Sequence, residues 1–461
     1  MNIWINKCDS DEIYKEFNEA YTFSISIESS TIYDGIYKIW REISVKPIES
    51  IYEDLSIIAL SIFSIDKRVS RWYEAKDKWT RDLKVSIPVL NYDKWKDTVN
   101  LWNEMLNFLT GDNWNINFRA TKNVYGKYYK REKIKEDISK CTAVSLFSGG
   151  LDSFCGALNL LDKGKSVCFI GHNEYPKLGD KQKKLKNAIK DEYPLQSVKF
   201  FSFTANSQAP EKNNEKLKHN ENTCRGRSLL FLSVAISVAG VIGEDIPVYI
   251  PENGFIGLNI PLTNNRKGSC STRTTHPFFI RKYNELLNKI GIKNTIKNFF
   301  AYKTKREVVN TVKDNNVFKN YAGSTISCSH PCLPRWNKDE NKREYPKNCG
   351  YCYPCLIRKS SLLGLNIDED YTYNRLNSCF LKGDSSNKTK MNDSIALINS
   401  AYRYKHIDDN EIRRLIRCTG PLTSEDVEKF LGVYKSTMKD ILEMIDNNRE
   451  IRDYTGIVDN E

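Results

Sequence analysis

Between residues 141 and 254, short runs of almost wholly apolar residues alternate with longer segments whose apolar positions recur at helical spacing. The runs have the length of β-strands and the longer segments that of helices. Strands without polar positions are buried on both faces, which is typical of a parallel sheet covered by helices on each side. The pattern predicts an α/β fold with strands at 142–147, 166–172, 197–206 and 247–254 and helices at 153–164 and 226–240.

The pattern before residue 136 is different, because runs of alternating apolar and polar residues are mixed with helical spacing. Alternation is typical of strands with one polar face. Residues 1–135 are therefore expected to form an N-terminal α+β domain of unknown role. Its predicted elements are strands at 21–29, 81–91 and 113–121 and helices at 50–72 and 92–112.

Two further boundaries follow from the pattern. A polar, lysine-rich stretch at 127–140 separates the N-terminal domain from the α/β domain, which is expected to cover 141–365. Residues 366–461 are mostly helical in pattern, and Thr423 with Asp426 forms a predicted capping box before the last helix. The chain is thus expected to have three regions.

The composition is that of a globular protein long enough for two or three domains. The chain has 461 residues, of which 40% are hydrophobic and 28% charged, and a single core rarely extends beyond about 250–300 residues. The N-terminus lacks the pattern of a secretory signal, and the apolar stretch 229–243 is shorter than the roughly 20 residues of a membrane span. We therefore expect a cytoplasmic protein that has no membrane partner.

The net charge of +12 favours partners rich in phosphate, such as nucleotides, pyrophosphate or nucleic acid. Much of the excess lies in lysine-rich segments such as 175–193, which have the pattern of a solvated helix face. Basic residues interleaved with stacking aromatics form no long stripe. The pattern therefore does not favour direct nucleic-acid binding, although it leaves it open.

The sharpest local signal is Ser148-Gly149-Gly150-Leu151-Asp152-Ser153, between the first strand of the α/β domain and the helix after it. In an open parallel sheet, ligands bind at the carboxyl ends of the strands, where such turns lie. The glycines let a ligand approach closely, and the N–H groups at the helix start, with the serine hydroxyls, bind an oxyanion. Asp152 would oppose a bare anion, so we expect Mg²⁺ to accompany a bound pyrophosphate. The alternative is a serine-capped turn without a ligand.

Thirteen cysteines in a chain without a secretory signal are more typical of metal binding than of disulfides, and five of them lie between 328 and 355. Two-residue gaps in the CGYCYPC segment turn thiolates toward one metal ion. Four thiolates suit tetrahedral Zn²⁺ in a closed, structural site. The predicted ligands are Cys328, Cys349, Cys352 and Cys355, with Cys332 and His330 as alternatives to the first.

The SGGLDS turn after a strand resembles the pyrophosphate loop of the ATP pyrophosphatase superfamily, whose members adenylate a substrate oxygen and release pyrophosphate. Together with the SC…CGYCYPCLIR pattern, it resembles the 7-cyano-7-deazaguanine synthase (QueC) family. That family converts 7-carboxy-7-deazaguanine, ATP and ammonia into a nitrile. Three more segments are similar to the family: RSLLFLSVA at 227–235, PENG at 251–254 and KTKREVV at 303–309. The resemblance covers about 141–365.

This resemblance implies roles for particular residues. Asp152, Lys305 and Arg227 would act on the phosphates as catalytic residues, although Arg227 could instead pair with a buried carboxylate. The implied ATP- and pyrophosphate-binding set is Ser148, Gly149, Gly150, Leu151, Asp152, Ser153 and Asn253.

Segment 264–287 departs from the family, because it stands in place of the family's substrate segment. Hydroxyls and a guanidinium suit the edge and the carboxylate of a deazaguanine, and Arg273 can hold a carboxylate through two hydrogen bonds. The residues expected to bind this acid are Thr272, Arg273, Thr274 and Thr275. His276 is expected to accept a proton from an attacking amine. Because Pro277 follows it at a helix start, His276 could alternatively serve only as a cap.

The altered segment and the flanking regions resemble the QueC-like proteins of bacterial antiphage operons such as the Qat system. A secondary amide formed with a protein amine cannot lose water to a nitrile without breaking its N–C bond. The resemblance therefore implies a defence ligase that forms AMP and pyrophosphate and joins 7-carboxy-7-deazaguanine to an amine of a protein encoded in the same operon. The alternatives are a biosynthetic nitrile synthase, a tRNA- or DNA-modification enzyme and an ATP-sensing scaffold. The flanking regions could also serve only oligomerisation or solubility.

Overall fold

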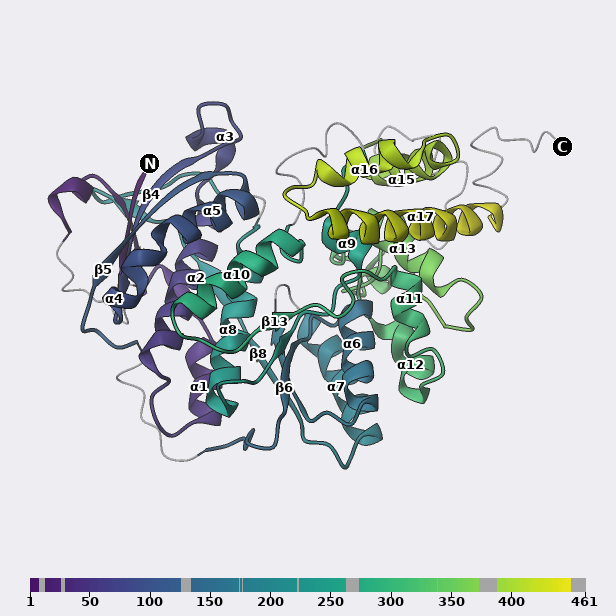
Figure 1. Cartoon of the computed structure of the whole chain (residues 1–461), viewed down its shortest axis with the longest axis horizontal. Coiled ribbons are helices and arrows are strands. Elements are labelled where there is room, and N and C mark those ends of the chain that lie inside the picture. Colours follow the sequence, from purple (N-terminus) through teal and green to yellow (C-terminus); the bar gives the residue numbers. More distant parts are fainter. Residues whose placement is uncertain are drawn as a thin grey trace.

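The centre of the fold is a five-stranded sheet, which is wholly parallel in the computed structural model (Figure 1). The structure describes residues 1–7, 13–25, 30–125, 134–173, 175, 177–221, 224–262, 273–337, 339–372 and 388–448. The strand order is β13-β12-β6-β7-β8. The strands are β6 (Ala143–Leu146), β7 (Val167–His172), β8 (Val198–Phe203), β12 (Val248–Tyr249) and β13 (Ile296–Lys297). This confirms the predicted α/β fold with a parallel sheet.

Helices cover both faces of this sheet because its strands are apolar on both sides. Successive strand residues point to opposite faces, so Val144 and Leu146 pack in one core and Ala143 and Phe147 in the other. The second core contains α6 (Leu151–Asp162) and α7 (Leu178–Glu192), and the first contains α8 (Arg227–Ile242). Helix α8 is apolar around most of its circumference because it lies between the sheet and a further helix.

The N-terminal region forms a second sheet, ordered β11-β10-β2-β1-β4-β5. Its strands are β1 (Asn2–Asn6), β2 (Tyr21–Ser24), β4 (Asp82–Val89), β5 (Asn113–Ala120), β10 (Glu211–Lys212) and β11 (Glu215–Lys216). The pairs among β2, β1, β4 and β5 are all parallel, which differs from the α+β arrangement expected from the sequence. Parallel neighbours need long crossovers, and helices supply them between β2 and β4 and between β4 and β5. Strand β1 was not predicted.

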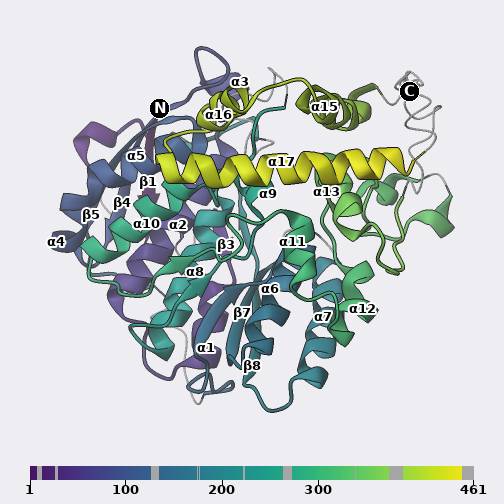
Figure 2. The ribbon, with the colours of Figure 1, turned by 45° about the vertical axis from the view of Figure 1, so that its right-hand side comes forward.

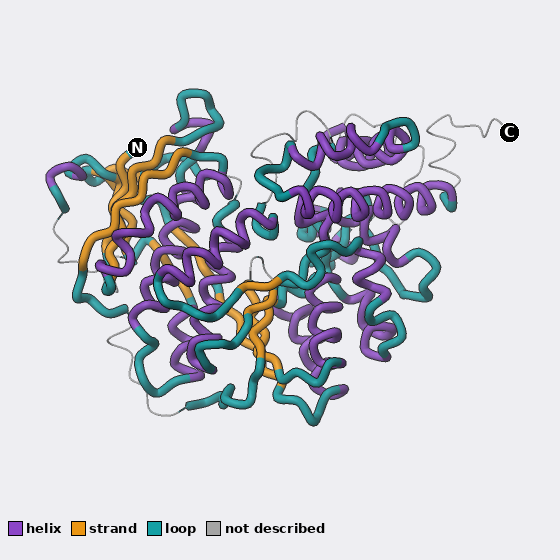
Figure 3. The backbone as a smooth tube through the Cα atoms, viewed as in Figure 1, coloured by secondary structure: helices purple, strands orange, loops and turns teal. Residues whose placement is uncertain are grey.

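These crossovers and the helices nearby bring the two sheets into one packed body. The N-terminal helices are α1 (Ile36–Ile43), α2 (Ser50–Arg68), α3 (Arg71–Glu74), α4 (Tyr92–Trp95) and α5 (Val99–Thr110). Helix α2 packs along α8, and a side chain at Gly240 would collide with the ring of Tyr52. Strand β3 (Ile32–Asp34) pairs with β9 (Ala205–Ser207). One continuous hydrophobic core therefore joins the regions on either side of residues 136–140, and Figure 3 shows helices between the two groups of strands.

The C-terminal region is helical, and it packs on the opposite end of the α/β domain. Its helices are α15 (Lys388–Tyr404), α16 (Asp409–Arg417) and α17 (Ser424–Asp446). Figure 2 shows α17 extending along the molecule above α9 (Gly254–Leu258) and α13 (Tyr353–Leu362), and all three helices share a core. The predicted capping box of Thr423 and Asp426 is confirmed. Asp426 also binds Arg281 and Tyr302, which ties α17 to α10 (Pro277–Lys289) and to the residues just before α11 (Lys305–Asn310).

One predicted strand of the α/β domain is shorter than expected, and one observed strand was not predicted. The strand expected at 247–254 pairs only at Val248–Tyr249, because the chain turns at Pro251 and Asn253 then caps α9. The fifth strand, β13, was missed, because only two of its residues pair in the sheet. The remaining helices are α10 (Pro277–Lys289), α11 (Lys305–Asn310) and α12 (Asn316–Tyr321).

Candidate functional site

Asp152, Asn253 and Lys305 meet at the carboxyl edge of the parallel sheet, although they are far apart in the sequence. Asp152 follows β6, Asn253 follows β12, and Lys305 begins α11 after β13. Strands β6 and β12 are neighbours, yet the chain leaves β6 toward β7 and returns to β12 only later. A gap between strands whose connections diverge in this way is the usual ligand crevice of an open parallel sheet. The topology thus explains why these three predicted residues converge.

The carboxylate of Asp152 is held at one oxygen only. Lys305 Nζ lies 2.8 Å from Oδ2, and Asn253 Nδ2 donates a hydrogen bond to the same atom at 2.8 Å. Both partners are themselves fixed, because Asn253 caps α9 and a capping box begins α11 at Lys305. The other oxygen, Oδ1, is buried and has no hydrogen-bond partner among the described residues. The site therefore presents one oriented but unsatisfied anionic oxygen.

Glu252 is a fourth residue of this site and its third charged one, and the sequence pattern had not singled it out. Its carboxyl interacts directly with Asp152, and burial, followed by the negative charge of Asp152, raises the pKa of Glu252 to about 8. Lys305 opposes that rise. The signal was present in PENG, where an acid directly precedes the asparagine at a strand end. The two carboxyl groups and one ammonium can hold a shared proton or a cation.

The glycine turn has the backbone geometry that its sequence predicts. Gly149 has φ of +84°, and a side chain there would lie 3.1 Å from Gln182 Cγ. The hydroxyls of Ser148 and Ser153 lie 3.2 Å apart, and the amide of Gly150 donates to Ser148 Oγ. The turn begins α6 with N–H groups that have no partner within the helix, as every helix start does. An oxyanion can bind here as expected for Gly149, Gly150 and Leu151, by sharing or replacing the hydroxyl groups that the amides of Gly150 and Leu151 bind, which are Ser148 Oγ and Ser327 Oγ.

The residues around Asp152 fit a magnesium–pyrophosphate group. Mg²⁺ takes oxygen ligands and commonly binds through one or two carboxylates together with substrate phosphates. The unpartnered Oδ1 of Asp152 is such an oxygen, and the nearby helix start suits the phosphates. Bound Mg²⁺ would neutralise charge on the leaving pyrophosphate.

The four predicted cysteines form one cluster that could hold a metal ion such as zinc. Their sulfur atoms all lie within 4.8 Å of one another. Four sulfurs at about 2.3 Å from one zinc ion lie about 3.8 Å apart in a tetrahedron, and two of the Sγ–Sγ distances are 3.9 Å. Backbone N–H groups of Ser329, His330, Cys349 and Cys352 donate to the sulfurs at 3.2–3.4 Å. The cluster contains Cys328, and neither Cys332 nor His330 replaces it.

Arg227 lies on α8, which covers the opposite face of the sheet from α6 and Asp152. It begins α8, and its charge helps to lower the pKa of His172 at the end of β7, after burial of that imidazole. Asp66, a buried carboxylate beside the start of α8, binds the backbone N–H groups of Arg225 and Gly226. Arg227 therefore faces the carboxyl end of β7, beside the glycine turn in strand order.

The residues expected to bind the acid lie between α9, α10 and the N-terminal region. Arg273 Nη1 donates to the backbone carbonyl of Phe108 at 2.9 Å, and the guanidinium of Arg273 lies over the aromatic ring of Phe108. Thr274 and Thr275 are buried, and Thr275 packs against Gly257 of α9. Thr272 lies outside the described residues. The structure thus connects Arg273 to α5 rather than to the carboxylate site.

His276 is a helix cap, which corrects its expected role as a base. Its Nδ1 accepts the N–H of Phe278, and its Nε2 lies 3.2 Å from Thr419 Oγ1. The side chain is fully buried, and burial, followed by the charge of Arg273, lowers the pKa of His276 to about 3. Both ring nitrogens are therefore occupied, and we do not retain His276 as a proton acceptor.

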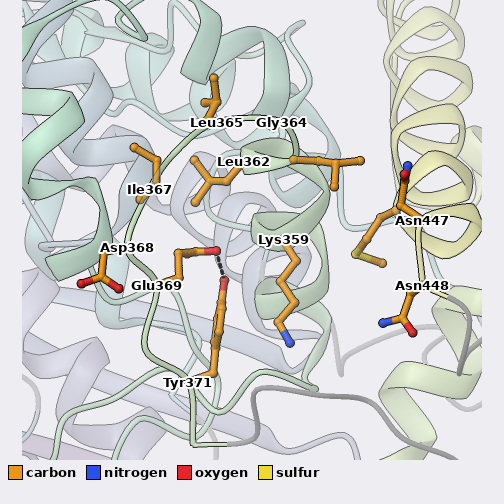
Figure 4. Close-up of a pocket in the computed structure, with 12 residues that line it drawn as sticks. Lys359, Leu362, Gly364, Leu365, Ile367, Asp368, Glu369, Tyr371, Asn447 and Asn448 are labelled. Carbon is orange, nitrogen blue, oxygen red and sulfur yellow. Dashed lines mark hydrogen bonds between the residues drawn. The ribbon is translucent and has the colours of Figure 1, made fainter.

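Two described cavities adjoin the cysteine-containing region. One, of about 270 Å³, includes Ile326 beside the glycine turn and the side chains of Lys181, Lys184, Lys319 and Lys347. The other, of about 560 Å³, lies between the ends of α13 and α17. Figure 4 shows its Lys359 between the hydrogen-bonded pair of Glu369 and Tyr371 and the amides of Asn447 and Asn448. The first lies close to the turn and has mixed charge, because Glu344, Asp368 and Asp370 line it together with the four lysines.

Comparisons with known proteins give no relatives from which to assign a role. No protein-family model matches the chain, and no curated protein matches it significantly. Among the described residues, none of the helices has both the length and the apolar character needed to cross a lipid bilayer. The site is therefore interpreted from its geometry and chemistry.

Proposed function

We propose that the chain is a cytoplasmic ATP-dependent ligase of antiviral defence that forms AMP and pyrophosphate. Its substrate is the carboxylate of 7-carboxy-7-deazaguanine, and its acceptor is an amine of a partner protein. The nucleobase comes from the resemblance of the SGGLDS and CGYCYPC segments to the 7-cyano-7-deazaguanine synthase family. The protein acceptor and the defence role come from the resemblance of segment 264–287 and the flanking regions to the QueC-like proteins of antiphage operons. ATP activation rests additionally on the geometry of the site.

One observation supports ATP activation above the others: the glycine turn and the Asp152–Lys305 pair lie together at the crossover of the parallel sheet. A helix start binds phosphate oxygens, while a fixed ammonium stabilises the charge that develops on departing pyrophosphate. A serine-capped turn without a ligand needs neither Lys305 nor an unsatisfied carboxylate oxygen beside it. The arrangement favours a phosphate-binding site over that alternative.

The proposed reaction has two balanced steps. The substrate carboxylate attacks the α-phosphorus of ATP, the bond to the β-phosphate oxygen breaks, and pyrophosphate leaves with both electrons of that bond. The amine then attacks the carbonyl carbon of the adenylate, AMP leaves, and one proton is released from the nitrogen. Lys305 stabilises the first leaving group, and the glycine turn holds its oxygens.

The test is to incubate the protein with ATP, Mg²⁺ and 7-carboxy-7-deazaguanine, with and without the proteins encoded beside it. We expect acid-dependent pyrophosphate release and a mass increase of one operon protein equal to the acid minus water. Free nitrile instead of a modified protein would identify the biosynthetic alternative. Binding of ATP without any pyrophosphate release would refute the ligase proposal.

A further inference from the structure

The segment 325–328 lies between the glycine turn and the cysteine cluster and binds both. On the side of the turn, Ile326 N–H donates to the carbonyl of Gly149 at 2.9 Å. The amide of Leu151, the first residue of α6, donates to Ser327 Oγ at 3.0 Å. The carbonyl of Ile326 lies 3.3 Å from the position that a side chain at Gly150 would take. The turn is therefore covered closely by this segment.

On its other side, the same segment belongs to the cysteine cluster. Cys328 is one of the four clustered residues and directly follows Ser327. The N–H of Ser327 donates to Asn348 Oδ1 at 2.9 Å, and Asn348 Nδ2 donates to the carbonyl of Thr325 at 3.0 Å. Asn348 in turn directly precedes Cys349. A metal ion bound by both Cys328 and Cys349 would thus fix the segment directly at Cys328 and indirectly through Asn348.

The position of Ser327 gives this arrangement a chemical consequence. The amide that binds Ser327 Oγ is one of the helix-start N–H groups suited to an oxyanion. A hydroxyl held there keeps the turn in its ligand-binding shape before a ligand arrives. Ser327 is one peptide bond from Cys328, a metal ligand. Disorder at the cysteine cluster would therefore displace the Ser327 hydroxyl from the turn.

We propose that segment 325–328 couples the metal cluster to the glycine turn, with Ser327 as the positioning residue. Loss of the metal then loosens the turn and weakens anion binding there, and an anion bound on the turn strengthens metal binding and so slows release of the metal. The two changes in affinity must be equal in free energy, because coupling between two binding sites is reciprocal. The second effect rests on the proposed function, whereas the first does not.

The test uses the full chain with bound zinc and three variants: Ser327→Ala, Ser327→Thr and Ser329→Ala. The last is a matched control, because Ser329 is exposed on the far side of Cys328. Zinc content is measured by metal analysis, and hydrogen exchange is followed for the peptide that contains Leu151. Affinity for inorganic pyrophosphate with Mg²⁺ is measured by calorimetry, and zinc transfer to a chelator is timed with and without pyrophosphate.

We expect Ser327→Ala to keep one zinc per chain while exchange at Leu151 becomes about threefold to tenfold faster, the equivalent of one net hydrogen bond. Pyrophosphate affinity should fall by a similar factor, Ser327→Thr should restore both values, and Ser329→Ala should change neither. Removing zinc from the unaltered chain should accelerate the same exchange. Pyrophosphate should slow zinc transfer in the unaltered chain and less so in Ser327→Ala.

Unchanged exchange at Leu151 in zinc-containing Ser327→Ala would overturn the coupling, even if zinc removal unfolds the chain. If exchange responds as expected but pyrophosphate does not bind, the coupling stands and the proposed function fails. If pyrophosphate binds equally well to the unaltered chain and to Ser327→Ala, and has the same effect on zinc transfer in both, the proposed function stands and the coupling fails.

Discussion

The Glu252→Gln substitution separates the stability of the fold from the chemistry of the site. In the folded chain, burial and the charge of Asp152 raise the pKa of Glu252 from 4.5 to about 8. Between these pH values the folded chain binds a proton that the unfolded chain has lost. The contribution of Glu252 to the free energy of unfolding is therefore fully present below pH 4.5, and it decreases progressively as the pH rises toward 8.

The size of this loss follows from the shift. Each pKa unit corresponds to about 1.4 kcal/mol, so a shift of this size corresponds to about 5 kcal/mol. Glu252 is only half-buried, so solvent screens part of the unfavourable effect of its ionisation beside Asp152. We therefore expect its ionisation to lower the free energy of unfolding by roughly 2 kcal/mol. Glutamine resembles the protonated acid in shape and cannot ionise. Glu252→Gln should therefore be about 2 kcal/mol more stable than the unaltered chain at pH 9 and nearly equal to it at pH 5.

The assay is urea unfolding at pH 5, 7 and 9, compared through the unfolding midpoints. Glu192→Gln is the control, because Glu192 is exposed at the end of α7 and its replacement should change the midpoint little at any pH. The same Glu252→Gln protein should release pyrophosphate more slowly, since stabilising changes at functional sites commonly cost activity. A midpoint difference that is the same at pH 5 and pH 9 would refute the reasoning.

Three further predictions concern neighbouring parts of the site. Asp152→Asn removes the charge that faces Lys305, so pyrophosphate release should fall at least a hundredfold, about 2.7 kcal/mol; a rate within twofold of the unaltered chain would exclude the proposed role. Gly149→Ala places a side chain at a left-handed φ of +84° and 3.1 Å from Gln182 Cγ. It should lower the free energy of unfolding, measured by thermal unfolding, by about 1–2 kcal/mol, and it should weaken pyrophosphate binding. The control Gly164→Ala, at a φ of +75° but in open space, should lower stability without changing pyrophosphate binding. Cys352→Ser should lose zinc and lower the unfolding temperature, because a closed thiolate site contributes folding energy; metal analysis that still finds one zinc per chain would contradict the cluster.

The local patterns of the sequence were sufficient for much of the site. Apolar runs predicted the parallel sheet because strands buried on both faces leave no polar positions. The two-residue gaps of the CGYCYPC segment predicted the cysteine cluster, because such gaps constrain thiolates to a few ångströms of one another. In the SGGLDS turn, Gly149 has a φ of +84°, which favours glycine, whereas Gly150 has an ordinary φ of −81°.

Other features depended on the tertiary structure, because they arise between segments that are distant in sequence. The raised pKa of Glu252 requires Asp152, which lies 100 positions earlier and arrives only because β6 and β12 are neighbours. His276 has the chemistry of a base in the sequence, but Thr419 and complete burial make it a cap. Strands β2, β1, β4 and β5 pair in parallel, and the crossover helix α2 between β2 and β4 packs on α8, which no local pattern in residues 1–135 encodes. Local periodicity fixes which faces are apolar, whereas burial, charge pairing and strand order are set by which of these faces meet.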